Sequence, residues 1–191
     1  IDRIFITHLH GDHMLGLPGL IQTMGMSGRK NPLEIYGPKG IGDAIMGMLN
    51  ACEGVYEYEL RIIEMDGSQT VNFDTHSVSS FPTNHGVPSL GFRYAENDSP
   101  GTFNRAKAIS LGISPGPDFG KLQKGESVNG VRPEQVMDMP RKGLSVVYTG
   151  DTVPDESVVI GSKDADLLIH DSTYDAGEDE RAAKHMHSTC I

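Results

Sequence analysis

The chain has 191 residues, of which 37% are hydrophobic, and this is enough for one domain with a sizeable core. Its formal net charge of −10, taken alone, argues against binding to nucleic acid. Two cysteines far apart in the sequence exclude a disulfide framework and indicate a reducing, cytoplasmic setting, and no segment approaches the 18 apolar residues of a membrane span.

Strand-like and helix-like runs alternate along most of the chain. We expect strands at residues 1–7, 33–36, 60–65, 69–73, 76–82 and 90–94, and helices at residues 15–26 and 40–51. The second helix is indicated by Ile41, Ile45 and Leu49, which recur at helical spacing. Further along, we expect strands at residues 144–149 and 167–170 and a helix at residues 178–186. This mixture predicts sheets with helices packed outside them.

The segment from about residue 95 to residue 142 breaks this alternation. Its many prolines and glycines are typical of an extended loop or arm, in which residues 103–111 could form a short helix. Half of all Lys and Arg residues gather in or beside it: Arg93, Arg105, Lys107, Lys121, Lys124, Arg132, Arg141 and Lys142. From these residues alone, a basic arm that grips RNA and an ordinary long surface loop both stay open.

The run Thr7-His8-Leu9-His10-Gly11-Asp12-His13 is the most informative feature of the sequence. In an extended segment residues i and i+2 point to the same face, so His8 and His10 can reach one metal ion together. Asp12 and His13 follow where the strand should turn, and they can reach a second metal ion beside the first. Imidazole nitrogen and carboxylate oxygen suit zinc, manganese or iron. We therefore predict a metal site here rather than a polar strand end with chance histidines.

Several stretches of the chain match one known family. The histidine run has the H-x-H-x-D-H signature of the metallo-β-lactamase superfamily. Within that superfamily the chain resembles ribonuclease Z (tRNase Z) in FITHLHGDHMLGLPGL (5–20), IYGPKG (35–40), HGVPSLGF (85–92), GPDFGKLQKGES (116–127), YTGDT (148–152) and HST (187–189). These stretches occur in the family's order and cover nearly the whole chain, and GPDFGKLQKGES is the specific part.

The resemblance implies an α/β (α+β) fold, the αββα sandwich of the metallo-β-lactamases. Residues 1–191 would form a single domain of this kind, truncated at both ends. Residues 95–142 would be an inserted tRNA-binding arm, or exosite. A preceding β-rich segment and a following segment would lie outside this chain, and the latter would carry the final metal-ligand histidine.

The resemblance also implies a site with two Zn²⁺ ions, for which Mn²⁺ or Fe²⁺ could substitute. Its implied ligands are His8, His10 and His85 for the first metal, Asp12 and His13 for the second, and Asp151 bridging both. Asp12 is also a catalytic candidate that orients or deprotonates the attacking hydroxide, and His187 is the candidate that donates a proton to the leaving 3′ oxygen or contacts the phosphate. Asp171 is expected to orient a ligand imidazole. On the arm, the candidates for RNA binding are Arg105, Lys107, Gly116, Pro117, Lys121 and Lys124.

The implied function is a hydrolase, an endoribonuclease that removes the 3′ trailer from precursor tRNA at the discriminator and leaves a 3′ hydroxyl. It would act as a cytoplasmic homodimer without a membrane partner. Three alternatives stay open: an aryl sulfatase-like or lactonase-like hydrolase of small esters or phosphodiesters, a non-catalytic tRNA-binding relative, and a redox di-iron relative. The basic arm argues against the first, the intact ligand set against the second, and a histidine rather than a carboxylate at His10 against the third.

Overall fold

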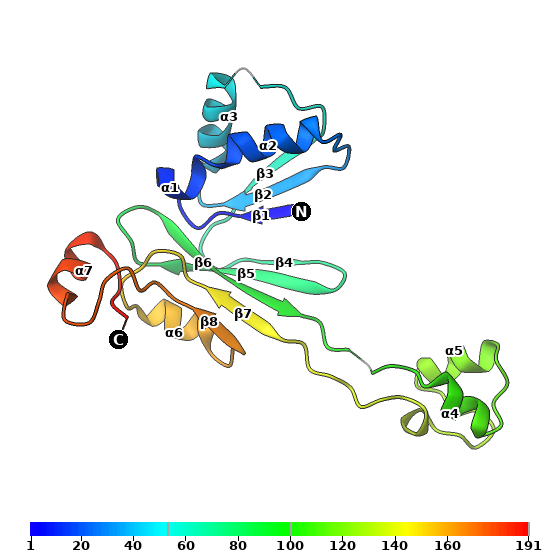
Figure 1. Cartoon of the computed structure of the whole chain (residues 1–191). Coiled ribbons are helices and arrows are strands. Elements are labelled where there is room, and N and C mark those ends of the chain that lie inside the picture. Colours follow the sequence, from blue (N-terminus) through cyan, green and yellow to red (C-terminus); the bar gives the residue numbers. More distant parts are fainter. Residues whose placement is uncertain (53, 100, 191) are drawn as a thin grey trace. The chain divides into compact units, whose positions relative to one another are not determined.

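The computed structural model of the protein describes residues 1–52, 54–99 and 101–190, and the chain divides into two compact units (Figure 1). The main unit comprises Ile1–Ala95 and Ser145–Ile191, and the inserted unit comprises Glu96–Leu144. Residue 53, residue 100 within the predicted arm and residue 191 at the end of the predicted domain lie outside the described residues. None of the described helices has the length and apolar character needed to span a bilayer.

The first sheet of the main unit has three parallel strands, β1 (Arg3–Phe5), β2 (Leu33–Gly37) and β3 (Leu60–Glu64). Helices α1 (Gly11–Met14), α2 (Leu17–Met26) and α3 (Ile41–Ala51) lie on one side of this sheet (Figure 1). Parallel strands need crossover connections, and α2 and α3 supply them. Ile21, Ile35 and Ile45 are fully buried in the core that these helices share with the sheet.

The second sheet has the strand order β4-β5-β6-β7-β8. Its strands are β4 (Thr70–Asn72), β5 (His76–Thr83), β6 (Ser89–Glu96), β7 (Ser145–Tyr148) and β8 (Leu167–Ile169). The β4–β5 and β6–β7 pairs are antiparallel, whereas β8 runs parallel to β7. Since β8 follows a crossover, helix α6 (Glu156–Ser162) occupies the connection between β7 and β8.

The two sheets pack face to face in the main unit. Tyr36 of the first sheet and Phe92 of the second belong to one buried apolar layer, which also contains Met65, Val78 and Leu90. On the other face of the second sheet, Val158 of α6 packs with Phe81 and Val147. The layers therefore run helices, sheet, sheet and helix, and the predicted αββα sandwich is confirmed.

The inserted unit has a small core of its own. Helices α4 (Arg105–Ser110) and α5 (Pro117–Gln123) and a 3₁₀ helix at Pro133–Gln135 surround a cluster of buried apolar side chains. These are Ala108, Ile113, Phe119, Leu122, Val128, Val131 and Val136. Asn104 caps α4, because its side chain accepts a hydrogen bond from the Lys107 N–H. The segment is thus more ordered than its glycines and prolines indicate.

The predicted strands and helices are present with shifts of at most two residues at each end, but α1, α5 and α6 are absent from the prediction. These helices have only four, seven and seven residues. Such short helices are not stable alone, so local sequence shows them poorly and tertiary packing decides them. In α5 the packing comes from Phe119 and Leu122, and in α6 from Val158 together with the Asp155 cap. The last helix of the chain, α7 (Asp179–His185), follows the prediction closely.

Candidate metal centre

The histidine run begins where β1 ends, between the two sheets. The Ile6 N–H donates to the Tyr36 carbonyl of the first sheet, and the Leu90 N–H of the second sheet donates to the Thr7 carbonyl. His8 comes next and is fully buried. Its Nδ1 lies 3.0 Å from Thr7 Oγ1, whereas its Nε2 has no hydrogen-bond partner among the described residues. A buried polar atom without a partner costs about 1–3 kcal/mol, so the position of His8 favours a bound cation.

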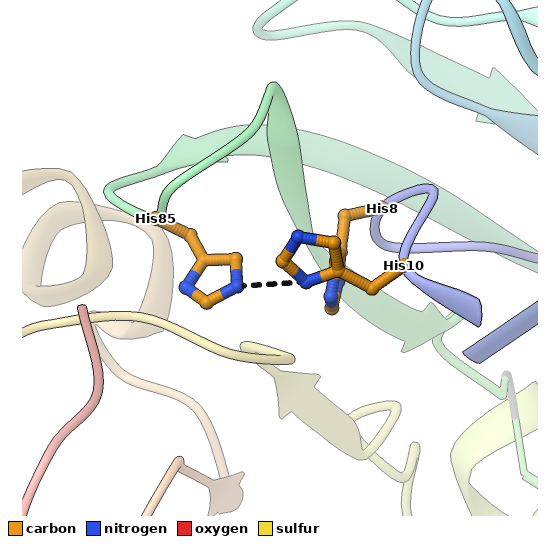
Figure 2. A group of neighbouring side chains, drawn as sticks. All are labelled: His8, His10 and His85. Carbon is orange, nitrogen blue, oxygen red and sulfur yellow. Dashed lines mark hydrogen bonds between the residues drawn. The ribbon is translucent and has the colours of Figure 1, made fainter. Parts of the chain in front are cut away.

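His8, His10 and His85 form the first potential ligand group, with one nitrogen from each within 4.8 Å of the others. Figure 2 shows the three imidazoles converging from the β1–α1 segment and from the loop after β5. His85 Nε2 lies 3.2 Å from His10 Nδ1, and two nitrogens that bind one tetrahedral zinc are expected at roughly 3.4 Å. The Met186 carbonyl accepts a hydrogen bond from His85 Nδ1 at 2.8 Å. This bond leaves His85 Nε2 unprotonated and facing the group, as a metal ligand must be.

His8, His13 and Asp151 form the second group. The Asp151 carboxylate lies 3.3 Å from His13 Nε2 and 3.7 Å from His8 Nε2. Gly150 allows this approach, since its φ of 62° suits glycine and a Cβ there would come within 2.8 Å of the Thr7 side chain. Asp151 thus stands between histidines of the run, where a bridging carboxylate was expected.

His187 joins His85 and Asp151 in a third group. Its Nδ1 donates to the Asp171 carboxylate at 2.8 Å, which leaves Nε2 as the nitrogen free for chemistry. The Asp171 side chain is only 2% exposed and also accepts bonds from the Thr173 hydroxyl and from the Thr152 and Thr173 N–H groups. Burial alone would raise the pKa of Asp171, but these hydrogen bonds outweigh it and lower that pKa. Asp171 is therefore a fixed negative charge that holds the His187 ring in one orientation.

Asp12 lies at the edge of the site. Its side chain is 79% exposed and its carboxylate is 3.4 Å from His13 Nε2. Within the described residues it belongs to none of the three groups. The structure therefore brings five of the six expected metal ligands together and leaves Asp12 beside them.

The residues fit a metal centre by their charge state as well as by their positions. Burial, with a smaller contribution from neighbouring His13, lowers the pKa of His8 from 6.5 to about 4. His8 is therefore neutral at pH 7, and the neutral imidazole is the form that binds a metal. Nitrogen and carboxylate donors in this combination suit zinc or another divalent transition metal.

The predicted RNA-binding residues all lie in the inserted unit, away from this cluster in sequence. Arg105 and Lys107 belong to α4. Pro117 and Lys121 belong to α5, which Gly116 and Lys124 flank. All six are exposed. Lys121 pairs with Asp118 at 2.8 Å, and this bond raises the Lys121 pKa.

Two hydrogen bonds of the site, each with a backbone carbonyl as acceptor, are not predicted from the sequence. The Met186 carbonyl that orients His85 comes from a residue with φ of 61°, rare for a side chain of this kind. The Ser188 hydroxyl donates to the Thr152 carbonyl and joins the His187 loop to the Asp151 loop. A backbone carbonyl leaves no residue-type signal, so only the HST stretch marked this region.

The comparison with known families agrees with this geometry. The family model described as "Beta-lactamase superfamily domain" matches residues 1–110, more than half of the chain. The chain belongs to the beta-lactamase superfamily. The match covers the histidine run and His85, so the superfamily assignment includes the first ligand group.

Within the superfamily, the chain is most informatively compared with curated relatives named Ribonuclease Z. A relative from Methanosarcina acetivorans, named Ribonuclease Z, is 46% identical over 99% of this chain and 63% of its own length. Another of that name, from Methanothermobacter thermautotrophicus, is 45% identical over 99% of this chain and 62% of its own length. The chain thus spans somewhat less than two thirds of the curated relatives that it matches.

Solved structures give the same result for the fold. The crystal structure of the short form of human tRNase Z is 29% identical, with a TM-score of 0.64 over 100% of this chain and 64% of that one. A metallo-β-lactamase fold protein from Bacillus subtilis is 18% identical with a TM-score of 0.60, over 99% of this chain and 56% of that one. At this lower identity the likeness concerns the fold alone.

Proposed function

We propose that the chain is the catalytic part of a metal-dependent endoribonuclease that removes the 3′ trailer from precursor tRNA. The observation that carries this proposal is the histidine and aspartate cluster, in a chain 46% identical to a protein named Ribonuclease Z over 99% of its length. The reaction is hydrolysis of one phosphodiester at the discriminator. Water adds to phosphorus, the bond from phosphorus to the 3′ oxygen breaks, and that oxygen takes up a proton to become the 3′ hydroxyl.

We assign the metal ligands as His8, His10 and His85 on one side, and Asp12 and His13 on the other, with Asp151 between them. Asp12 is included because its carboxylate is 3.4 Å from His13 Nε2 and its exposed side chain is free to turn. Two bound Zn²⁺ ions, or Mn²⁺ or Fe²⁺, would neutralise charge on the phosphate and lower the pKa of a bound water.

His187 is proposed as the acid for the leaving 3′ oxygen. Its Nδ1 is held by Asp171, so the proton to be donated sits on Nε2, beside His85 and Asp151. The fixed carboxylate holds the His187 ring in one orientation, much as a buried aspartate does for a catalytic histidine elsewhere. Asp12 would orient the attacking water or accept its proton.

The inserted unit is proposed to hold the RNA. Arg105, Lys107 and Lys124 are exposed and form no ion pair with the described residues. Such cations contact phosphates without reading sequence, which suits an enzyme that accepts many tRNAs. Gly116 and Pro117 begin α5 and shape the turn beside Lys121.

We further propose that the protein acts as a homodimer in the cytoplasm, with the inserted unit of one protomer presenting RNA to the other. The dimer follows from the family resemblance. The two exposed free cysteines, Cys52 and Cys190, support a reducing compartment. Light scattering on the purified protein measures the mass and tests the dimer.

The function is tested on the natural full-length protein with a trailer-bearing precursor tRNA. Cleavage at the discriminator, a 3′ hydroxyl on the tRNA product and loss of cleavage with chelator are expected. An intact precursor in the presence of bound metal would refute the assignment.

The role of His187 is tested with Asp171→Asn, for which kcat should fall about tenfold to a hundredfold while KM stays close to its original value. Asp175→Asn, an exposed aspartate nearby in the chain, is the matched control.

A further inference from the structure

A cleft opens beside His187, and the other residues that line it belong to none of the three potential ligand groups. It has a volume of about 190 Å³ and lies between helix α7, the loop that follows α7 and the loop that follows Asp151. Its walls are mostly apolar: Val153 and Pro154 come from the second loop, and Ala182 and Ala183 from the helix. The polar groups that line it belong to Asp179, His187, Ser188 and Thr189.

Hydrogen bonds tie the walls of this cleft to the metal centre. The Met186 carbonyl accepts from His85, and the His187 N–H donates to the Ala182 carbonyl at 2.9 Å. On the other side, the Ser188 hydroxyl donates to the Thr152 carbonyl at 2.6 Å. A group bound in the cleft is therefore held at a set position relative to His187 and Asp151.

The lining of the cleft indicates what kind of group it takes. Small apolar side chains on two sides suit a flat ring. The Asp179 carboxylate is exposed and forms no ion pair or hydrogen bond with the described residues, so it can accept hydrogen bonds from a ligand. A ring with apolar faces and N–H donors on its edge describes a nucleobase, and single-stranded RNA is recognised by such a combination of ring contacts and edge hydrogen bonds.

The position next to His187 indicates which nucleotide is bound. In the proposed reaction, the proton from His187 goes to the 3′ oxygen that leaves phosphorus. This oxygen belongs to the nucleotide on the 5′ side of the cut. That nucleotide must lie against His187, and the cleft is a space that His187 lines together with Val153 and Ala183.

We propose that this cleft binds the base of the nucleotide immediately 5′ of the cut, with Asp179 accepting hydrogen bonds from the amino group of that base. The inference rests on the proposed function and adds a base preference to it. Adenine, guanine and cytosine carry an exocyclic amino group, whereas uracil presents carbonyl oxygens on both sides of its one N–H. The carboxylate of Asp179 repels those oxygens, so uracil is the disfavoured base.

The test uses the natural full-length protein and four precursors of one tRNA that differ only in the discriminator base. The wild-type protein should cleave the uracil precursor with a kcat/KM about fivefold lower than the adenine precursor, a modest value for a hydrogen bond to an exposed charged group. Asp179→Asn should bring this ratio close to one, because an amide donates as well as accepts. Glu180→Gln, the adjacent acidic residue, which does not line the cleft, is the control that should keep the wild-type ratio.

A second variant tests the cleft independently of Asp179, because removing one carboxylate changes the cleavage ratio only modestly. Ala183→Leu places a larger side chain in the cleft on an exposed helix position where leucine is well tolerated. We expect KM to rise for all four precursors, by about tenfold, with the fold unchanged by circular dichroism.

The cleavage rates of the four precursors separate a failure of the base subsite from a failure of the proposed function. Equal cleavage of all four precursors by the wild type overturns the base subsite while the proposed function stands. Sensitivity to the first trailer base instead of the discriminator also overturns it, because the cleft would then serve the wrong side of the cut. Failure to cleave any precursor overturns the proposed function, and the subsite falls with it.

Discussion

The main unit and the inserted unit differ in charge and in where their functional groups lie. The sequence of the main unit holds 20 Asp and Glu against nine Lys and Arg, a net charge of −11, and the inserted unit holds six against seven, a net charge of +1. All eight histidines belong to the main unit. The overall charge of −10 therefore comes from the main unit, whereas the inserted unit has a slight excess of positive charge.

The two units also differ in how their groups are connected. In the main unit His8 and Asp171 are buried, and hydrogen bonds join His85, His187 and their carbonyl or carboxylate partners. In the inserted unit, Arg105 and Lys124 stand exposed on a small core. When hydrogen-bonded groups act as a unit, removing one of them abolishes most of the activity that they support together. Separate surface cations instead contribute small, additive amounts to the free energy of binding.

The largest effect is expected for His85→Asn in the main unit. Removing one ligand of the first group should lower kcat/KM for precursor cleavage about a thousandfold, as expected for a loss of about 4 kcal/mol of charge stabilisation. Metal content measured by mass spectrometry should fall as well. His76→Gln changes a histidine outside the three groups and is the control. Full activity of the His85 variant would show that this group does not hold the catalytic metal.

A change of pH should destabilise the metal-free protein through the main unit. His8 has a folded pKa of about 4 against 6.5 for the free side chain. Between these values the unfolded chain binds a proton that the folded chain does not, so stability falls as pH drops from 6.5 to 4. The shift corresponds to a loss of about 3 kcal/mol in the free energy of unfolding. Urea titrations of chelated protein measure it, and His8→Gln should flatten the pH dependence; an equally steep curve in that variant would assign the effect to other groups.

Deletion of the inserted unit should separate binding from chemistry. The Glu96 N–H donates to the Leu144 carbonyl at 2.9 Å, so a short Gly-Ser turn can join these residues. Loss of the phosphate contacts should lower kcat/KM for precursor tRNA about a hundredfold. Hydrolysis of bis(p-nitrophenyl) phosphate, which is too small to need those contacts, should change far less. An equal loss on both substrates would mean that the inserted unit also supports the metal centre.

The sequence predicts much of the metal centre, because several of its ligands lie close together along the chain. His8, His10 and His13 sit within six residues, and period-two geometry already places His8 and His10 on one face. The contributions of His85, Asp151 and His187 depend on contacts between distant segments. The resemblance to a known family supplied them, and residue spacing could not.

The sequence predicts the inserted unit less well. Its glycines and prolines indicate a loop, yet Phe119, Leu122 and Val136 bury themselves in a local core. Short helices there depend on tertiary packing, which a propensity argument does not include. The exposed position of Asp12 is likewise set by its place in the one-turn helix α1, which no pattern in the sequence marks.

The smallest effect is expected for single cations of the inserted unit. Arg105→Ala should weaken binding of precursor tRNA about threefold at physiological salt and reduce the slope of log K against log salt by roughly 0.7 to 0.9, the value for one phosphate contact. Lys30→Ala in the main unit removes an exposed lysine that is paired with Glu57, and it should leave both quantities unchanged. Filter binding across a salt series measures affinity and slope together. If Arg105→Ala lowers affinity without changing the slope, the arginine acts on the fold of the inserted unit rather than on RNA phosphates. If Lys30→Ala matches it, the RNA is attracted to the whole surface, and the contrast between the two units loses its functional meaning.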